Sequence, residues 1–344
     1  DNKIVGTFNQ MNVSLPLTLT PGEDKPNRPQ TPVGPFPYAT EEVTFANGDY
    51  ILSGTLTLPE GCSRKTPVLL MVTGSGQQNR DEELFDHRPF AVIADALART
   101  GVATLRYDDR GFGDSSAKPM EWTTEDFKLD ALAGLELLRE RFDKVGVLGH
   151  SEGGTIAMMI AAEKKADFIV SLAGMAISGA ETLLWQNRVA LKGLGFTDEQ
   201  VAPYCKMLET AFDVRVNGGR MPNPDDYNIP QSLMQNYWAV VAQIQMPYMI
   251  HFLSLDVRSI LDNVTCPVLA LNGSKDNQVD YESNLNAIRN GLPSNSKNCI
   301  ETIEGVNHLF QHCKTGQVPE YRTIEETFAP EVLEIIVKWM SNFK

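Results

Sequence analysis

The sequence contains few basic residues for its size and has no long apolar segment. Its 344 residues include 30 lysines and arginines against 44 aspartates and glutamates, which gives a formal net charge of −14. Such an acidic chain is a poor partner for nucleic acid or for an anionic membrane surface, because like charges repel. No segment reaches the ~20 apolar residues of a membrane-spanning helix. Nucleic-acid binding and membrane insertion are therefore not expected.

Residues that usually hold metals or build disulfide frameworks are also scarce. The five cysteines include no Cys-x-x-Cys pair, and the five histidines include no His-Glu-x-x-His pattern. A metal site is therefore not predicted. An odd number of cysteines cannot all pair within the chain, and a chain of this length needs no disulfide framework. Buried free thiols are expected, and a disulfide between Cys299 and Cys313 is left open for an exported chain.

The most informative pattern is a serine between a strand-like segment and a helix-like one. Residues 145–148 are apolar, residues 149–153 read Gly-His-Ser-Glu-Gly, and small residues with helical character follow. A serine on so sharp a turn exposes its hydroxyl, and the glycines avoid collisions with the neighbouring strand and helix. The dipole of the helix behind Ser151 favours negative charge at this point. The pattern predicts that Ser151 is a nucleophile, provided that a base and an acid are found.

From residue 41 onward, strand-like and helix-like segments alternate. A hairpin around Asn47-Gly48 comes first. Apolar strands are then predicted at 67–73, 102–107, 144–149, 168–173, 267–272 and 298–303, and helices at 88–100, 125–142, 152–164, 281–292 and 329–343. This alternation predicts an α/β fold with a mostly parallel, doubly wound sheet that is covered on both faces and led by an antiparallel hairpin.

Two regions depart from this alternation of strands and helices, and they suggest the domain organisation. Residues 176–262 are rich in Met, Trp and Tyr and mostly helical in pattern; we interpret them as a helical cap inserted into a catalytic domain over 41–344. Most of their aromatic residues are expected to form the core of the cap. Residues 1–40 combine a weak hairpin pattern over 3–19 with a linker containing six prolines. We interpret the hairpin as the remnant of an upstream module; docking on the main domain and pairing with another chain are the alternatives.

A serine nucleophile needs a general base, and the base needs an orienting acid. In a parallel sheet both come from loops at the carboxyl ends of later strands. Asp276 directly follows the strand 267–272, and His308 follows the strand that ends near 303. The order Ser, Asp, His along the chain is that of α/β-hydrolases. We therefore expect Asp276 and His308 to complete a triad with Ser151.

Three nearby residues have simpler interpretations. Asp280 precedes a predicted helix and is expected to cap its N-terminus. His312 lies one helical turn beyond His308 and farther from the strand end, so it is the weaker candidate for the base. The side chain of His150 is expected to pack sideways from the turn.

Three further motifs carry a family resemblance. Residues 74–81 read Gly-Ser-Gly-Gln-Gln-Asn-Arg-Asp, residues 108–115 read Asp-Asp-Arg-Gly-Phe-Gly-Asp-Ser, and residues 273–279 fit Gly-x-x-Asp-x-x-Val. With these motifs in this order, residues 41–344 resemble the α/β-hydrolase superfamily. More narrowly, they resemble bacterial serine carboxylesterases with a Gly-Ser-Gly-x-Gln-x-Arg-Asp loop. Members with this loop often carry a small upstream β-module, and residues 3–19 look like its tail.

The resemblance implies an α/β-hydrolase fold and the hydrolysis of carboxylic esters through an acyl-enzyme. Ser151 would attack the acyl carbonyl, His308 would take and return the proton, and Asp276 would fix the imidazole tautomer. The backbone N–H groups of Glu152 and of Ser75, or Gly76 in place of Ser75, would form the oxyanion hole. No cofactor is implied, because the triad and the oxyanion hole supply the chemistry.

The charged residues of the two loops are expected to have structural roles. Asp108 and Asp109 are expected to brace their loop through Arg110. Arg80 and Asp81 either line the entrance of the site or form a surface ion pair, and the sequence favours neither alternative.

The expected substrate is a small or medium acyl ester, with the cap shaping the pocket. Oligopeptidase-like or acyl-thioesterase activity on the same triad is the alternative, and a non-catalytic binding protein on the same scaffold is a more distant one. The chain begins at Asp1 rather than methionine, and we expect an exported protein, periplasmic or secreted; a cytoplasmic location is the alternative. The oligomeric state is not predicted.

Overall fold

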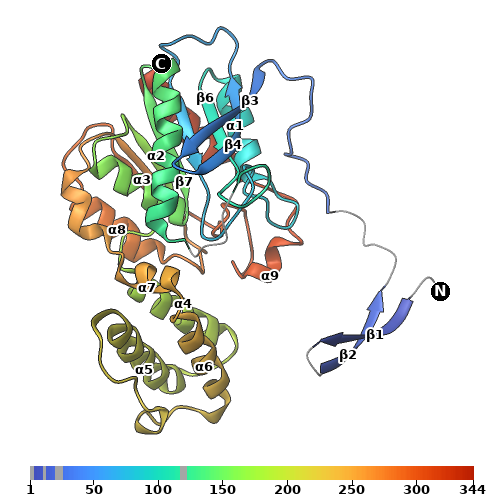
Figure 1. Cartoon of the computed structure of the whole chain (residues 1–344), viewed down its shortest axis with the longest axis vertical. Coiled ribbons are helices and arrows are strands. Elements are labelled where there is room, and N and C mark those ends of the chain that lie inside the picture. The colour runs from blue at the N-terminus through green and yellow to red at the C-terminus, as the bar shows by residue number, and fades with distance from the viewer. Residues whose placement is uncertain (1–3, 11–12, 20–25, 117–121) are drawn as a thin grey trace.

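The apolar segments of the sequence form the central strands of one large sheet. A computed structural model describes residues 4–10, 13–19, 26–116 and 122–344 (Figure 1). Every residue of the strands at positions 68–72, 145–150, 169–172 and 268–273 is buried. The eight strands are β3 (Ala39–Asn47), β4 (Tyr50–Leu58), β5 (Val68–Val72), β6 (Ala103–Tyr107), β7 (Val145–His150), β8 (Ile169–Leu172), β9 (Val268–Gly273) and β10 (Cys299–Ile303). Each predicted strand is found within a residue or two of its expected bounds.

The topology of the sheet places the carboxyl ends of its central strands at one edge. The strand order is β10-β9-β8-β7-β5-β6-β4-β3. The strands β5 to β10 pair in parallel, whereas β4 pairs antiparallel with both β3 and β6. The chain continues from β5 to β6 on one side and then to β7 on the other. Loops leaving β5 and β7 therefore diverge, which opens a crevice at the usual ligand position of such sheets.

Helices cover both faces of the sheet, as predicted. Alternate residues of a strand point to opposite faces, and within β5 Leu69 and Met71 pack in one layer while Leu70 and Val72 pack in the other. The first layer contains α1 (Pro89–Arg99) and α10 (Pro330–Met340); the second contains α2 (Thr124–Arg141), α3 (Glu152–Ala162) and α8 (Tyr281–Gly291). The short α9 (Val318–Tyr321) and η4 (Ser341–Phe343) complete this part of the chain. The predicted doubly wound α/β fold is confirmed.

A group of helices follows β8 and precedes β9. It comprises α4 (Gly179–Gly193), α5 (Asp198–Asn217), η1 (Pro224–Asp226), η2 (Gln231–Leu233), α6 (Met234–Gln243), α7 (Pro247–Ser254) and η3 (Val257–Asn263). Figure 1 shows that α4 and α7 lie against the main body, while α5 and α6 extend away from it. The insertion has its own apolar core, in which Tyr204 and Tyr237 are fully buried. Trp238, by contrast, is 53% exposed.

The amino-terminal segment has two parts. β1 (Ile4–Gln10) and β2 (Val13–Leu19) pair antiparallel in a separate two-stranded sheet (Figure 1). Residues 20–25 of the expected linker lie outside the described residues. Beyond them, Arg28 donates hydrogen bonds to the carbonyl oxygens of Phe85 and Ile324, and the Tyr38 hydroxyl donates to Asp95 at 2.8 Å. The described part of the proline-rich segment is thus held against the main body by polar contacts.

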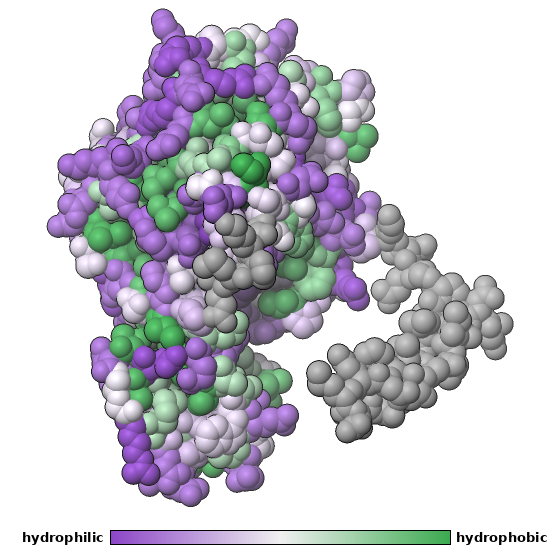
Figure 2. Space-filling model, in the orientation of Figure 1, coloured by the Kyte–Doolittle hydropathy of each residue, from purple (hydrophilic) through white to green (hydrophobic). Residues whose placement is uncertain are grey.

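The visible surface carries both hydrophilic and hydrophobic residues. Figure 2 shows hydrophilic residues interspersed with smaller hydrophobic patches over the main body and the insertion. Within the described ranges, none of the helices combines the length and the apolar character needed to cross a membrane.

Candidate active site

Ser151 occupies a strained turn between β7 and α3. Its φ of 53° and ψ of −120° lie in a region that non-glycine residues rarely adopt. A Cβ atom on Gly149 would lie 1.9 Å from the Gly153 carbonyl oxygen, and one on Gly153 would lie 2.1 Å from the Val72 carbonyl oxygen. Only glycine fits at either position, as the sequence analysis expected. The turn therefore holds Ser151 at the carboxyl edge of the sheet, in the local geometry of a nucleophile elbow.

Asp276 and His308 meet beyond the ends of β9 and β10. His308 Nδ1 lies 2.7 Å from Asp276 Oδ2, and both side chains are buried. The second carboxylate oxygen of Asp276 accepts hydrogen bonds from the backbone N–H groups of Gln278 at 2.7 Å and Val279 at 2.9 Å. Since both oxygens of Asp276 are engaged, the carboxylate is fixed and it orients the imidazole. His308 and Ser151 line the same cavity.

The loop after β5 lies directly against the serine. A Cβ atom on Gly74 would lie 3.1 Å from the Cβ of Ser151, and Ser75 lines the cavity beside it. None of the described groups accepts a hydrogen bond from the backbone N–H of Ser75 or Glu152. Gly76 has a φ of 89° and is absent from the described cavity wall. Ser75 thus brings an unused N–H to the cavity wall, and the unused N–H of Glu152 lies on the residue that directly follows Ser151.

The side chain of Glu152 forms a contact that the sequence analysis missed. It is buried, and its carboxylate accepts hydrogen bonds from the hydroxyls of Thr124 and Tyr248, both at 2.6 Å. Burial and the nearby Glu152 carboxylate raise the pKa of Tyr248 far above its usual range. Because Tyr248 belongs to α7, this hydrogen bond joins the helical insertion to the residue that follows Ser151. No local pattern marks a partner 96 positions away.

A second missed contact links three loops of the site. His150 Nδ1 lies 2.8 Å from Glu82 Oε1, and His150 Nε2 lies 2.9 Å from the carbonyl oxygen of His308. The same Glu82 oxygen accepts a hydrogen bond from the backbone N–H of Gly74 at 2.8 Å. Burial lowers the pKa of His150, but the Glu82 carboxylate and the His308 carbonyl outweigh it, so that the net direction is upward. His150 and Glu82 therefore connect the loop after β5, the serine turn and the loop that carries His308.

Arg80 and Asp81 follow neither of the two alternatives stated for them. Arg80 binds Asp108 at 2.7 Å and Glu42 at 2.5 Å, and it is only 15% exposed. Asp81 pairs with Arg106 of β6. The two residues thus connect their loop to neighbouring strands and loops instead of pairing with each other, and neither lines the cavity.

The expected role of Arg110 was wrong. Its guanidinium binds Asp130 of α2 at 2.6 Å, with both side chains at most 2% exposed, rather than the two aspartates before it. Asp109 instead accepts hydrogen bonds from the Thr73 hydroxyl at 2.8 Å and the Gln78 N–H at 2.9 Å. The loop after β6 is therefore braced by the segment after β5 and not by Arg110, because that segment lies beside it at the edge of the sheet.

Asp280 has the structural role predicted for it. Asp280 caps α8 by accepting from the Ser283 N–H. His312 is half exposed and pairs with Glu326 at 2.9 Å, away from the serine cavity. The cysteines are free thiols, but the expectation that they are buried holds only for Cys205, because the other four are partly exposed. In the described part of the chain, no group of three or more His, Cys, Asp or Glu residues is arranged to hold a metal ion.

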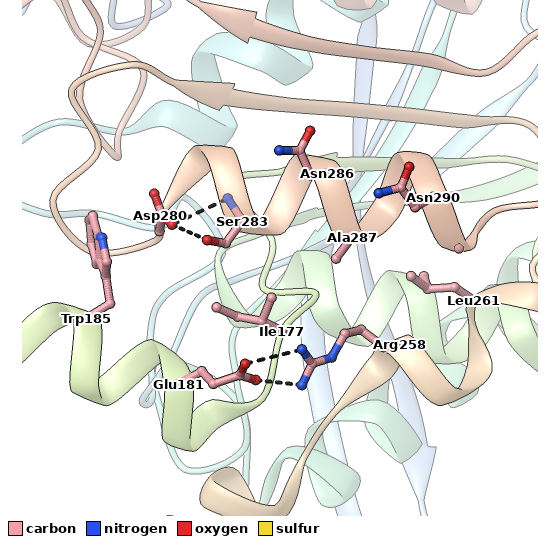
Figure 3. A pocket seen from close by; sticks show the side chains of 11 residues that line it. Ile177, Glu181, Trp185, Arg258, Leu261, Asp280, Ser283, Asn286, Ala287 and Asn290 are labelled. Carbon is pink, nitrogen blue, oxygen red and sulfur yellow. Dashed lines mark hydrogen bonds and ion pairs between the residues drawn. The ribbon is translucent and has the colours of Figure 1, made fainter. Parts of the chain in front are cut away.

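The cavity at Ser151 has a volume of about 820 Å³. Its floor is formed by the serine turn and the His308 loop, and its walls come from the loop after β5 and from α4, α6 and α7 of the insertion. A second hollow of about 630 Å³ lies between α4, η3 and α8 (Figure 3). There Arg258 pairs with Glu181 and Asp280 with Ser283, so its charged groups are already matched. Ser151 and His308 line the first of these two cavities and not the second.

Comparison with known proteins agrees with this architecture. The chain matches the family model described as "Alpha/beta hydrolase family" over residues 69–313. It is 28% identical over 311 residues to Esterase EstD of Thermotoga maritima, an alignment that covers 90% of this chain and 69% of that protein. Two solved structures are similar at a TM-score of 0.53. They are the proline iminopeptidase of Mycobacterium smegmatis, with 19% identity over 88% of this chain and 98% of that one, and the Pyrococcus furiosus esterase Pf2001, with 16% identity over 89% and 93%. At these identities the two structures show a shared fold.

Proposed function

The chain belongs to the alpha/beta hydrolase family, and on this basis we propose that it is a serine carboxylesterase whose triad is Ser151, His308 and Asp276. One observation carries the proposal. A strained serine turn and a buried histidine–carboxylate pair border the same cavity, at the edge of the sheet where ligands of such folds bind. The similarity to Esterase EstD supports ester hydrolysis as the reaction.

The geometry of His308 defines its role in the proposed reaction. Its Nδ1–H donates to the fixed carboxylate of Asp276, which leaves the lone pair on Nε2 to accept a proton. Ser151 Oγ attacks the carbonyl carbon of the ester, and its proton passes to Nε2. When the tetrahedral intermediate collapses, the C–O bond to the alcohol breaks and the alkoxide takes this proton. Water then repeats the sequence on the acyl-enzyme and releases the acid.

The backbone N–H groups of Glu152 and Ser75 are proposed as the oxyanion hole. Both have no acceptor among the described residues and border the serine. Glu152 is also the first residue of α3, so the positive end of the helix dipole adds to the stabilisation. Ser75 is preferred to Gly76 because only Ser75 lines the cavity. Donors placed in this way typically contribute about 3 kcal/mol each to the lowering of the barrier.

Labelling with a fluorophosphonate probe tests the nucleophile. We expect the wild-type protein to be labelled, Ser151→Ala to be unlabelled and about 10⁶-fold less active, and Ser254→Ala, at an exposed serine of α7, to be labelled normally. Absence of wild-type labelling would contradict the proposal and would favour a binding protein on this scaffold.

A panel of p-nitrophenyl esters from acetate to decanoate tests the reaction. The proposal expects rates well above the uncatalysed background for short and medium acyl chains, because the cavity walls include apolar side chains from the insertion. Background rates across the whole panel, together with normal labelling of Ser151, would contradict an esterase and favour peptidase or thioesterase activity on the same triad.

A further inference from the structure

Three carboxamide side chains in the wall of the serine cavity are held in one orientation. The side-chain nitrogens of Gln77, Gln186 and Asn187 donate to backbone carbonyl oxygens at 2.6, 2.7 and 2.8 Å, respectively. A carbonyl oxygen can only accept a hydrogen bond, so the NH₂ end of each amide must face its backbone partner. The amide oxygens are therefore the free ends of these side chains, and none of the described residues donates a hydrogen bond to them. Gln77 comes from the loop after β5, whereas Gln186 and Asn187 come from α4.

The cavity offers no free charge to an ionic ligand. No lysine or arginine is found among the described residues that line it. Its two carboxylates are already engaged: Glu82 binds His150 and the Gly74 N–H, and Glu83 pairs with Arg88 at 3.0 Å. Both ring nitrogens of His150 are engaged as well, so an anionic substrate would find no unpaired cation here, and an ammonium group would have to displace an existing partner. The wall therefore favours a neutral ligand that brings its own hydrogen-bond donors.

Another part of the cavity lining is apolar. Met175, Met249 and Phe252 form a small buried cluster with Leu183 packed against it, and all four line the cavity. Such a surface suits a short acyl chain, which gains free energy when it leaves water. The cavity thus offers apolar side chains that suit an acyl group and an acceptor wall, the free amide oxygens of Gln77, Gln186 and Asn187.

We propose that the substrate is an O-acylated sugar or sugar alcohol, a neutral ester whose alcohol part carries several hydroxyl groups. This inference rests on the proposed esterase function and names its substrate class. Hydroxyl groups donate to the free amide oxygens of Gln77, Gln186 and Asn187, while the acyl group lies against the apolar cluster. A volume of about 820 Å³ exceeds the need of a simple short ester and suits a ligand of this size.

A matched pair of substrates tests the proposal. In 6-O-acetylglucose, the acetyl group is attached through a CH₂ group to a ring with hydroxyls; cyclohexylmethyl acetate has the same connection to a ring without them. We expect kcat/KM to be at least tenfold higher for the sugar ester, and acetylcholine to be a poor substrate because it is cationic. Equal values for the two ring esters, or a preference for acetylcholine, would overturn the proposal.

Substitution of Gln186 tests whether this residue causes the preference for the sugar ester. Gln186→Met removes the acceptor with little change in volume, and we expect it to lower the ratio of kcat/KM for 6-O-acetylglucose to kcat/KM for cyclohexylmethyl acetate about tenfold. Gln245→Met is the control, because Gln245 is an exposed insertion residue whose nitrogen also donates to a backbone carbonyl but which does not line the cavity. An unchanged sugar preference in Gln186→Met would overturn the assignment.

The two proposals fail in different ways. Loss of all p-nitrophenyl acetate hydrolysis and of Ser151 labelling would contradict the esterase itself. Normal hydrolysis of p-nitrophenyl acetate without a preference for the sugar ester would contradict only the substrate class.

Discussion

Replacing Glu82 with glutamine removes one buried charge and leaves the shape of the site nearly unchanged. In the wild-type protein, one nitrogen of His150 faces the Glu82 carboxylate and the other faces the His308 carbonyl. Both partners can accept, and an imidazole that donates to both of them carries a second proton and a positive charge. The pKa of His150 is raised, which also favours the charged imidazolium. The Glu82→Gln substitution leaves this imidazolium without its counter-charge.

The expected loss of stability follows from the burial of the pair. The side chains of Glu82 and His150 are 5% and 7% exposed, so solvent screens them little. An unpaired buried charge costs about 3–5 kcal/mol. If His150 instead releases its proton, one ring nitrogen is left unmatched, which costs about 1–3 kcal/mol. We expect Glu82→Gln to lower the free energy of unfolding at pH 6 by about 2–4 kcal/mol.

Urea denaturation, monitored by tryptophan fluorescence, measures this loss in the free energy of unfolding. Glu83→Gln is the matched control, because the neighbouring Glu83 pairs with Arg88 at a site where the arginine is 45% exposed; it should lose less than about 1 kcal/mol. In the double variant Glu82→Gln/His150→Gln both charges are absent, and it should be more stable than the sum of the single losses by at least ~1.5 kcal/mol.

The pH dependence gives an independent check. The pKa of His150 is higher in the folded protein than its ordinary value of about 6.5. The stabilisation is therefore complete below about pH 6.5 and is lost as the pH rises through the folded value. The deficit of Glu82→Gln should shrink at alkaline pH. Additive effects in the double variant, or equal losses for Glu82→Gln and Glu83→Gln, would refute the reasoning.

Three further predictions concern single carboxylates. Asp276→Asn should lower kcat for p-nitrophenyl acetate about 10⁴-fold with little change in KM, because an amide does not hold the required tautomer of His308; a loss below tenfold would contradict the triad. Burial raises the pKa of Asp109 to about 8, so this group binds its proton more tightly in the folded chain and the protein loses stability as the pH rises from about 4 to about 8. Asp109→Asn should therefore gain stability relative to the wild type between pH 5 and pH 8, by at most about 1.4 kcal/mol per unit of pH; parallel pH profiles in urea unfolding would argue against it. Asp280→Ala should lower the free energy of unfolding by about 0.5–2 kcal/mol through loss of the α8 cap, and an unchanged urea midpoint would show that the cap contributes nothing.

The fold was predictable because its signals are local. Continuous apolar segments such as 68–72 and 145–150 are buried on both faces, and this pattern is visible in the residues themselves. Helix signals such as the acidic cap at Asp280 and the proline at the start of α10 are also local. The predicted export and the upstream module of residues 3–19 depend on sequence context beyond these signals, and they stay predictions.

The charged loops were less predictable because their partners come from other loops. Arg110 was expected to act on the aspartates beside it, but it reaches Asp130 of α2. Arg80 pairs with Asp108, 28 positions away. Proximity in sequence is a poor guide here, because neighbouring side chains on an irregular loop often point in different directions while loops from adjacent strands meet at the sheet edge.

The sequence by itself determined the order of strands and helices, the glycine-flanked turn of Ser151, and the placement of Asp276 and His308 at strand ends. These features follow from local periodicity and from the rule that parallel strands end at one edge. Only the tertiary structure decided which side chains surround them. Glu82 contacts His150 across 68 positions and Tyr248 contacts Glu152 across 96, and the acceptor wall of the cavity combines the loop after β5 with α4. Such contacts depend on how distant loops and the insertion pack together over the sheet, and this packing leaves no periodic pattern in the chain.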